Sequence, residues 1–373
     1  MSQDLIIIGG GIIGAACAEA CARAGCSTLL LESDVIGGGV TGSAMGHLVV
    51  LDDSEAQFAL TRDGVERWRK RSAALPADLE FDPCGTLWLA ADAEDLALAE
   101  RRHAFYAARG VQTEVVNAQR LRQLEPNLAP DLMGGLLVPG DAVLYPPAAA
   151  RYLLDQACAA GARWETARAV AVAPGSVTLA DGRVLKAERV VLASGASVSE
   201  LLPGVPVRPR KGHLIITDRY PAFVRHQLIE LGYLRSAHSA GTESVAFNIQ
   251  PRKTGQMLLG SSRQFGDTGP DVVPAMLDRM IRRAQRFLPA IGTLQALRCW
   301  TGFRPASPDH LPLIGPADAT GRLWLATGHE GLGITTSLAT GALVADLLTG
   351  TTPSIPAEPY RPTRFPADAS NHG

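Results

Sequence analysis

The sequence predicts an α/β protein in which a Rossmann-like domain, assembled from separated stretches of chain, carries an inserted domain built on an antiparallel β-sheet (an α+β part). Two observations support this prediction. A strand, a glycine-rich turn, a helix and a second strand follow one another between residues 4 and 32. Alternating strands and helices return near the C-terminus, while the chain between these regions is rich in strand patterns.

The N-terminal segment predicts a βαβ unit. Residues 4–8 (DLIII) form an apolar run that ends at a glycine, and residues 12–24 (IIGAACAEACARA) are rich in helix formers and small residues. The helix ends near Gly25, and residues 27–31 (STLLL) predict a second buried strand that finishes at Glu32. Strands joined by a crossover helix run parallel, so the sheet is predicted to be parallel here.

The middle of the chain mixes both types of element. Besides a glycine-rich loop at residues 37–46, the patterns predict helices over 56–74 and 148–160, a strand over 85–91 and a charged helical segment over 92–124. A hairpin is predicted within residues 177–191, with its turn at Asp181 and Gly182. Residues 189–193 are predicted to end a buried strand. Further strands are predicted over 207–217, 245–250, 256–262 and 323–326, and further helices over 274–287 and 338–348.

The composition excludes several classes of protein. The chain is 46% hydrophobic and 19% charged with a net charge of −2, so it lacks the basic excess that nucleic acid binding requires. No segment approaches the roughly 20 apolar residues of a membrane-spanning helix, and the opening apolar run has no basic leader. The six cysteines form no CxxC pair, which favours reduced thiols. We therefore expect a cytoplasmic protein; peripheral attachment to the inner membrane stays open.

The N-terminal turn predicts a dinucleotide site. Residues 9–14 (GGGIIG) match G-x-G-x-x-G, in which Gly9 allows the tight turn, Gly11 admits the pyrophosphate and Gly14 lets helix and strand pack closely. The helix N-terminus offers NH groups to phosphate, and Glu32 is placed to accept hydrogen bonds from ribose hydroxyls. This unit alone leaves FAD and NAD open. The residues assigned to the cofactor here are Gly9, Gly11, Ile12, Ile13, Gly14, Glu32 and Ser33.

Five further motifs follow in order along the chain: residues 41–46 (TGSAMG), 192–196 (LASGA), 302–305 (GFRP), 309–315 (DHLPLIG) and 326–333 (ATGHEGLG). Together with the N-terminal glycines they resemble the D-amino acid oxidase-like FAD oxidoreductases, the group of glycine oxidase, sarcosine oxidase and D-hydroxyproline dehydrogenase. The resemblance covers nearly the whole chain. It implies FAD as the cofactor and no metal, with residues 1–83, 145–212 and 300–373 as the FAD-binding domain and residues 84–144 and 213–299 as the substrate-binding domain.

The resemblance also implies the remaining FAD contacts. They are Thr41, Ser43, Ala44, Gly46, His47 and Leu48 in the loop against the flavin, Val170 beside the adenine, Ser194, Gly195 and Ala196 near the pyrophosphate, Gly302 and Arg304, and His329, Glu330, Gly331, Leu332, Gly333, Ile334 and Thr335 in the C-terminal turn and helix. For Val170 a purely structural place in a sheet is an equal alternative.

The substrate carboxylate calls for a rigid bidentate donor, and an arginine guanidinium meets that need better than a lysine. Arg304 lies in the segment that carries the family's carboxylate clamp; a salt bridge to Asp309 is the structural alternative. No acid/base triad is expected, because a neutral amine can deliver its α-hydrogen directly to flavin N5 as hydride. The protein's task is then orientation.

The substrate prediction rests on finer likenesses. No arginine follows His329, which departs from the glycine oxidase pattern, whereas residues 211–213 (KGH) and 247–252 (FNIQPR) look most like D-hydroxyproline dehydrogenases. The expected substrates are cis-4-hydroxy-D-proline or D-proline, oxidised to an imine. Further substrate contacts are predicted at Glu330, His213, Gln250, Tyr233 and Arg252, each of which has a structural alternative as a turn, strand or surface residue.

Two other functions stay open. The same chemistry with oxygen as acceptor would make the chain a glycine, sarcosine or D-amino acid oxidase. A non-catalytic alternative is an FAD-binding subunit of an electron-transfer complex. The electron acceptor, whether quinone, partner flavoprotein or oxygen, has no short signature, and both homo- and hetero-oligomers are compatible with the sequence.

Overall fold

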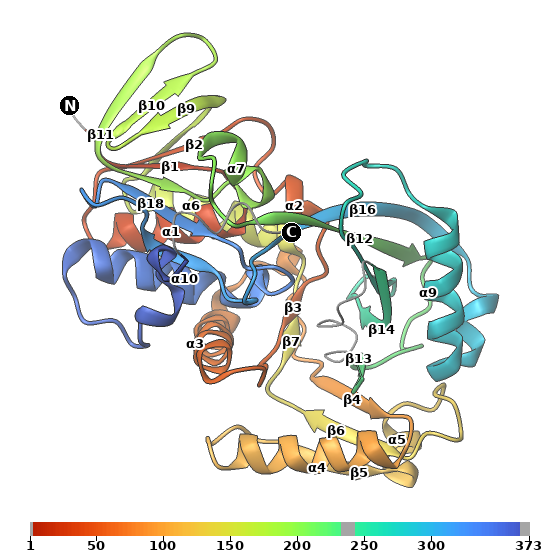
Figure 1. The fold of residues 1–373 in the computed structure, drawn as a ribbon. Helices are drawn as coiled ribbons and strands as arrows, with labels where there is room; N and C mark the ends of the chain where they lie inside the picture. The colour runs from red at the N-terminus through yellow and green to blue at the C-terminus, as the bar shows by residue number, and fades with distance from the viewer. Residues whose placement is uncertain (1–2, 233–242, 366–373) are drawn as a thin grey trace.

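The computed structural model describes residues 3–232 and 243–365. Two large β-sheets lie side by side, each with its own helices, and the chain crosses between them several times (Figure 1). In the described ranges, no helix has the length and apolar character needed to span a membrane.

The first sheet contains the N-terminal βαβ unit. Its main path, in spatial order, is β17 (Leu313–Pro316), β18 (Leu323–Thr327), β11 (Val184–Leu192), β1 (Gln3–Ile8), β2 (Thr28–Glu32) and β8 (Arg163–Thr166). All neighbouring pairs are parallel except β17 with β18. β9 (Ala169–Ala173) and β10 (Ser176–Leu179) extend β11 as an antiparallel hairpin. The parallel order predicted for the first two strands is confirmed.

Alternate residues of β1 enter different cores, because successive side chains of a strand point to opposite faces. Leu5 and Ile7 pack against helices, whereas Ile6 and Ile8 face the layer that includes the β9–β10 hairpin. The helical layer consists of α1 (Ile12–Arg23), α6 (Pro146–Ala159), α10 (Gly333–Thr349) and, outside them, α3 (Glu55–Arg71).

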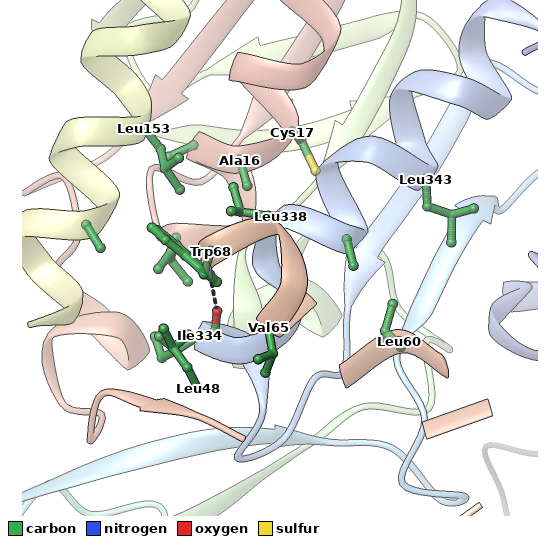
Figure 2. Close-up of a cluster of buried hydrophobic side chains, with 14 of the residues drawn as sticks. Ala16, Cys17, Leu48, Leu60, Val65, Trp68, Leu153, Ile334, Leu338 and Leu343 are labelled. Atoms are coloured by element: carbon green, nitrogen blue, oxygen red, sulfur yellow. Dashed lines mark hydrogen bonds between the residues drawn. The ribbon is translucent and has the colours of Figure 1, made fainter. Parts of the chain in front are cut away.

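The helices of this layer pack around one buried tryptophan. Trp68 of α3 is fully buried, and its indole Nε1 donates to the Ile334 carbonyl at 3.2 Å (Figure 2). Leu338 of α10 and Leu153 of α6 lie in the same apolar cluster. This packing fixes the start of α10, and that helix end matters for the site.

The second sheet is mainly antiparallel. In spatial order it contains β16 (Ala296–Ala306), β12 (Arg208–Thr217), β15 (Met257–Gln264), β14 (Glu243–Pro251), β13 (Gln227–Glu230), β4 (Thr86–Ala90), β6 (Gly134–Val138) and β5 (Glu114–Asn117). Only β13 with β4 is parallel. Helix α9 (Pro274–Phe287) packs on β14 and β15, and α4 (Ala93–Ala107) and α5 (Ala118–Leu124) pack near β6.

The predicted domain boundaries after residues 212 and 299 fall inside β12 and β16, so each strand carries residues assigned to both domains. The helical segment predicted over 92–124 needs a correction, since β5 separates α4 from α5. The shorter elements are α2 (Gly39–Gly42), α7 (Val198–Leu201), the paired strands β3 (His47–Leu48) and β7 (Ala142–Val143), and 3-10 turns at Ser72–Ala74, Ala77–Leu79, Gly195–Ser197, Pro289–Thr293, Glu358–Tyr360 and Pro362–Arg364. All six cysteines are free.

Candidate active site

A cavity of about 570 Å³ opens at the carboxyl ends of the parallel strands. Gly9 follows β1, Glu32 ends β2, Ala167 follows β8 and Ala193 follows β11; each of these residues lines the cavity. Thr327, the last residue of β18, lines it as well. Open α/β sheets bind their ligands at this edge, so the position alone marks a ligand site.

The glycine turn packs closely against neighbouring backbone, as the motif predicts. Gly9 has φ +111°, and a Cβ there would lie 2.6 Å from the carbonyl oxygen of Ala193. A Cβ on Gly14 would lie 1.8 Å from the carbonyl oxygen of Gly9, so strand and helix touch through bare backbone. Gly11 lines the cavity beside Thr41. A phosphate group can therefore approach the backbone of this turn directly.

The Glu32 carboxylate is hydrogen-bonded to the backbone of the glycine turn. Its Oε2 accepts from the Gly10 amide at 2.6 Å, and its Oε1 accepts from the Asp34 amide at 2.9 Å. These bonds hold the carboxylate at the cavity wall. Oε1 also accepts from the Ser33 hydroxyl at 3.2 Å, whereas Oε2 retains a lone pair that can accept a hydrogen bond from a ribose hydroxyl.

Two helices aim their N-termini at the same cavity. Ile12 begins α1 and Gly333 begins α10, and both residues line the cavity. Neither helix has an acidic residue in its first turn. The positive ends of both helix dipoles therefore face the cavity without a carboxylate from their own first turns, which suits an anionic ligand.

Most predicted FAD contacts meet at this cavity. Those that line it are Gly9, Gly11, Ile12, Ile13, Glu32, Ser33, Thr41, Ser43, Ala44, His47, Ser194, Gly195, Gly302, Arg304, His329, Glu330, Gly331, Gly333 and Ile334. Those that lie outside its lining are Gly14, Gly46, Leu48, Val170, Ala196, Leu332 and Thr335. Several of the latter support the wall: Thr335 Oγ1 donates to the His47 carbonyl and accepts from the Val49 amide.

Val170 lies just beyond the cavity lining. Its side chain is 48% exposed, and residues 167–169, immediately before it, line the cavity. Its contact with the adenine stays a prediction. The chain turns from β8 into β9 just before Val170, so the residues that face the cavity lie at the turn and not within the new strand.

The side chain of Arg304 extends across the second sheet and lines the cavity. It starts on β16, passes over Gly212 of β12, and its Nη1 donates to the Ser262 carbonyl of β15 at 2.9 Å. A Cβ on Gly212 would lie 2.3 Å from that nitrogen, so the glycine opens the path for the guanidinium. The alternative salt bridge to Asp309 is not formed, because both Asp309 oxygens accept from Arg364.

A second, smaller chamber of about 70 Å³ adjoins the cavity. Its walls are His47, Val49, Leu51, Asp53, Gln57, Trp88, Ile229, Asn248, Arg263, Arg304, His310, Glu330, Gly331 and Leu332. Five of these residues line both spaces and so mark the junction between them: His47, Asn248, Arg304, Glu330 and Gly331.

His47 is a neutral imidazole at this junction. Burial and the nearby charge of Arg304 lower the pKa of His47 to about 3. Its Nε2 is buried and has no hydrogen-bond partner within the described ranges. His329 behaves differently, because burial lowers its pKa to about 3 but its Nε2 is paired with Thr340 Oγ1 at 3.0 Å.

Glu330 is engaged by two neighbours. One carboxylate oxygen accepts from Arg210, and the other lies 3.0 Å from Nδ1 of His310. Burial opposes ionisation of this carboxyl, but the hydrogen bond to His310 and the charge of Arg210 outweigh it and lower the pKa of Glu330 to about 2. The substrate contact predicted for Glu330 therefore competes with two bonds already present.

Three predicted substrate contacts lie away from both spaces. His213 points to the other face of β12, where Ser262 and the Val273 amide engage its two ring nitrogens. Gln250 accepts from the Gly46 amide at 3.0 Å and so supports the flavin-side loop. Arg252 pairs with Glu80, and Tyr233 lies outside the described residues.

Several residues of the second sheet were not predicted from the sequence but line the cavity or the chamber. Gly212, Asn248, Ser261 and Arg263 all belong to strands of the second sheet and face one of the two spaces. Residues 211–213 and 247–252 contain Gly212 and Asn248, which line the site, as well as His213 and Gln250, which do not. The period of two along a strand separates Gly212 from His213. Asn248 and Gln250 share one face of β14, and Gln250 differs because the Gly46 amide engages it.

Similarity to known proteins agrees with this geometry. A family model described as FAD dependent oxidoreductase (DAO) matches residues 4–347. The chain is 28% identical to the bifunctional protein ThiO/ThiG of Nostoc sp., covering 93% of this chain but only 53% of that protein, so it spans about half the length of this relative. It is 28% identical to glycine oxidase of Bacillus licheniformis, covering 93% of each chain.

The fold is also that of a solved relative. The crystal structure of glycine oxidase from Geobacillus kaustophilus matches with a TM-score of 0.86 and 25% identity, covering 98% of this chain and 99% of that one. The bare glycine turn, the two helix N-termini and the cavity of about 570 Å³ fit FAD, the cofactor that the family resemblance implies. The match over residues 4–347 shows that the chain belongs to the FAD dependent oxidoreductase family.

Proposed function

We propose that this oxidoreductase oxidises the CH–NH bond of a D-amino or imino acid to an imine, with cis-4-hydroxy-D-proline or D-proline as the best candidates. One observation carries the proposal: Arg304 lines both the FAD cavity and the small chamber beside it. A guanidinium at that junction can hold a carboxylate while the rest of the substrate fills the chamber. The FAD contacts and the domain division predicted above are part of this proposal.

The junction offers the amine a hydrogen-bonding partner. His47 is neutral there, and its buried Nε2 has no partner among the described residues. In the tautomer that carries its proton on Nδ1, this Nε2 accepts an N–H from a neutral amine. The amine in its neutral form is the one whose α-hydrogen leaves as hydride.

When bound, FAD supplies the two-electron acceptor, with flavin N5 as the position that receives the hydride. The chain supplies orientation through Arg304, and the α10 N-terminus at Gly333 faces the cavity with its positive dipole end. That end stabilises negative charge on a reduced flavin. The preference for D-substrates rests on the family resemblance.

A substrate panel tests the proposal without assuming an acceptor. The purified yellow protein is mixed anaerobically with D-proline, cis-4-hydroxy-D-proline, other D-amino acids, L-proline, glycine and sarcosine, and flavin bleaching is followed by absorbance. We expect the cyclic D-imino acids to bleach the flavin fastest. Absence of bleaching by every D-amino and imino acid would refute the proposal.

Oxidation of glycine with oxygen is the second candidate, favoured by the relatives named glycine oxidase. In the panel it would appear as preferential bleaching by glycine or sarcosine. Stopped-flow mixing of the reduced protein with air then separates an oxidase from a dehydrogenase. Slow reoxidation by air with fast reoxidation by a quinone or a partner flavoprotein supports the dehydrogenase.

A further inference from the structure

We propose that Asn248 and Arg263 form a subsite that binds a hydroxyl group on the substrate ring. The inference rests on the proposed function and deepens it, because it assigns the part of the chamber that would tell a hydroxylated imino acid from an unsubstituted one. Neither residue was among the predicted site residues.

The two side chains reach the chamber from neighbouring strands. Asn248 lies on β14 and Arg263 on β15, and both face the small chamber of about 70 Å³. Asn248 is 2% exposed and Arg263 is 4% exposed, so both polar groups are shielded from bulk water. A substituent held in this chamber therefore meets polar groups from both strands.

Their hydrogen-bonding capacities are complementary. The guanidinium of Arg263 can only donate, while the carbonyl Oδ1 of Asn248 accepts and has no partner among the described residues. A hydroxyl accepts one hydrogen bond and donates another, so it can accept from the guanidinium and donate to the Asn248 oxygen. A carboxylate offers no donor to Asn248, and an unsubstituted methylene leaves that oxygen unpaired, which is costly in a buried site.

The other walls fit the body of a small ring. Val49, Leu51, Trp88 and Ile229 are all buried and apolar. They offer contact surface for ring methylenes, while Arg304 at the junction takes the carboxylate end. The chamber is also lined by the polar residues Asp53, Gln57, His310 and Glu330. It therefore combines a charged entrance, apolar contact surface for a ring, and polar side chains, among them Asn248 and Arg263, that can bond to a hydroxyl.

The test measures kcat and KM for cis-4-hydroxy-D-proline and D-proline in the FAD-loaded protein and in Asn248→Leu and Arg263→Met. We expect the wild-type protein to prefer the hydroxylated substrate in kcat/KM by about tenfold or more. Each variant should bring that ratio close to one, mainly through KM, because the hydroxyl lies away from the reacting carbon. Arg279→Met, which changes an exposed arginine of α9, is the matched control and should keep the wild-type ratio.

The outcomes separate the two levels of the proposal. If neither imino acid reduces the flavin, the proposed function fails and the subsite with it. If both substrates react but the two variants keep the wild-type ratio, only the subsite is overturned. If D-glutamate is preferred over D-norvaline and Arg263→Met removes that preference, the patch binds a carboxylate and the hydroxyl assignment is wrong.

Smaller changes guard against misfolding. If Asn248→Leu or Arg263→Met loses the yellow colour of bound FAD, Asn248→Ala and Arg263→Lys supply the same ratio. Asn248→Asp retains an acceptor for the hydroxyl and should therefore keep more of the preference than Asn248→Ala does. Equal ratios in these two variants would count against a hydrogen bond to residue 248.

Discussion

The FAD cavity and the small chamber beside it are built from different parts of the chain. Backbone forms much of the cavity's phosphate end, where the Gly9 turn and the N-termini of α1 and α10 meet at the ends of parallel strands. Side chains form the chamber, where Asn248, Arg263 and Arg304 project from one antiparallel sheet. A ligand common to a whole family can be held by backbone, whereas a particular substrate must be recognised by side chains.

This difference predicts how each region responds to substitution. In the cavity, an added methyl group should do more harm than the loss of a polar atom, because the close approach of backbone segments leaves no room. In the chamber, the loss of one charged group should change substrate binding and leave FAD in place. Four substitution experiments examine this contrast.

The largest effect is expected at Gly14. A Cβ there would lie 1.8 Å from the Gly9 carbonyl oxygen, so Gly14→Ala must separate α1 from β1 and displace the phosphate-binding turn. We expect FAD affinity to fall at least about a thousandfold, which corresponds to roughly 4 kcal/mol. Flavin absorbance after gel filtration and equilibrium titration with FAD provide the measurement. Gly140→Ala is the control, since a Cβ on Gly140 meets nothing within 4 Å.

Retention of FAD by Gly14→Ala at wild-type affinity would show that the helix and strand can separate freely. The far-ultraviolet circular dichroism of the variant should be recorded with the titration. If the variant is unfolded even with excess FAD, the turn is needed for folding and not for FAD binding alone.

The backbone-built region was the more predictable one. A sequence motif such as residues 9–14 fixes a local conformation, and the strand, turn and helix around it all occur within one short segment. The same holds for the parallel order of β1 and β2. The last helix was predicted over 338–348, whereas α10 begins at Gly333.

The second-largest effect is expected for Arg304→Lys. Lysine cannot form the bidentate pair and cannot both reach the Ser262 carbonyl and hold a carboxylate in the same plane. We expect the substrate KM to rise about a hundredfold with FAD still bound. Steady-state kinetics give KM, and the flavin spectrum reports the cofactor. Arg298→Lys, on the same strand beside Trp300, should leave KM unchanged.

An unchanged KM in Arg304→Lys would remove the carboxylate clamp from the proposed function. Loss of FAD together with the rise in KM would show that Arg304 supports both FAD binding and substrate binding. The contrast between the cavity and the chamber would then not hold at this residue.

The third prediction concerns Glu330, which joins the two regions by pairing with Arg210 of the second sheet and with His310. Its pKa is about 2, below the ordinary value of 4.5, so the unfolded chain binds more protons between these pH values. The stabilisation is thus full above pH 4.5 and is lost as the pH falls toward 2. Between pH 5 and pH 3 the loss is about 2 kcal/mol.

Denaturation by urea at pH 5 and at pH 3 measures this contribution. The free energy of unfolding of Glu330→Gln should depend less on pH than that of the wild-type protein by about 2 kcal/mol over this range. His310 does not confuse the comparison, because the hydrogen bond to Glu330 raises its pKa and it stays protonated at both pH values. Glu66→Gln, in an exposed pair with Arg62, is the control. Equal pH dependence in wild type and Glu330→Gln would contradict the assignment.

The side-chain-built region was harder to predict for a physical reason. A strand pattern shows which residues alternate, but which face meets the cofactor depends on how the sheet is placed against the other domain. His213 was predicted as a substrate contact in the segment 211–213, yet its neighbour Gly212 is the residue that faces Arg304. Gln250 lies on β14 like Asn248 but is engaged by the Gly46 amide, a contact between residues far apart in sequence.

The smallest and most discriminating effect is expected at residues 212 and 213. In Gly212→Ala a Cβ would lie 2.3 Å from Nη1 of Arg304, so the guanidinium must shift while its charge remains. We expect the substrate KM to rise about tenfold, less than in Arg304→Lys, because a displaced guanidinium still attracts a carboxylate. His213→Asn changes the opposite face of β12, where the Val273 amide meets the ring, and should lower thermal stability while changing KM less than about twofold. The reverse pattern, with KM sensitive at His213 and indifferent at Gly212, would mean that the other face of β12 meets the substrate, since two adjacent residues of one strand lie on opposite faces of the sheet.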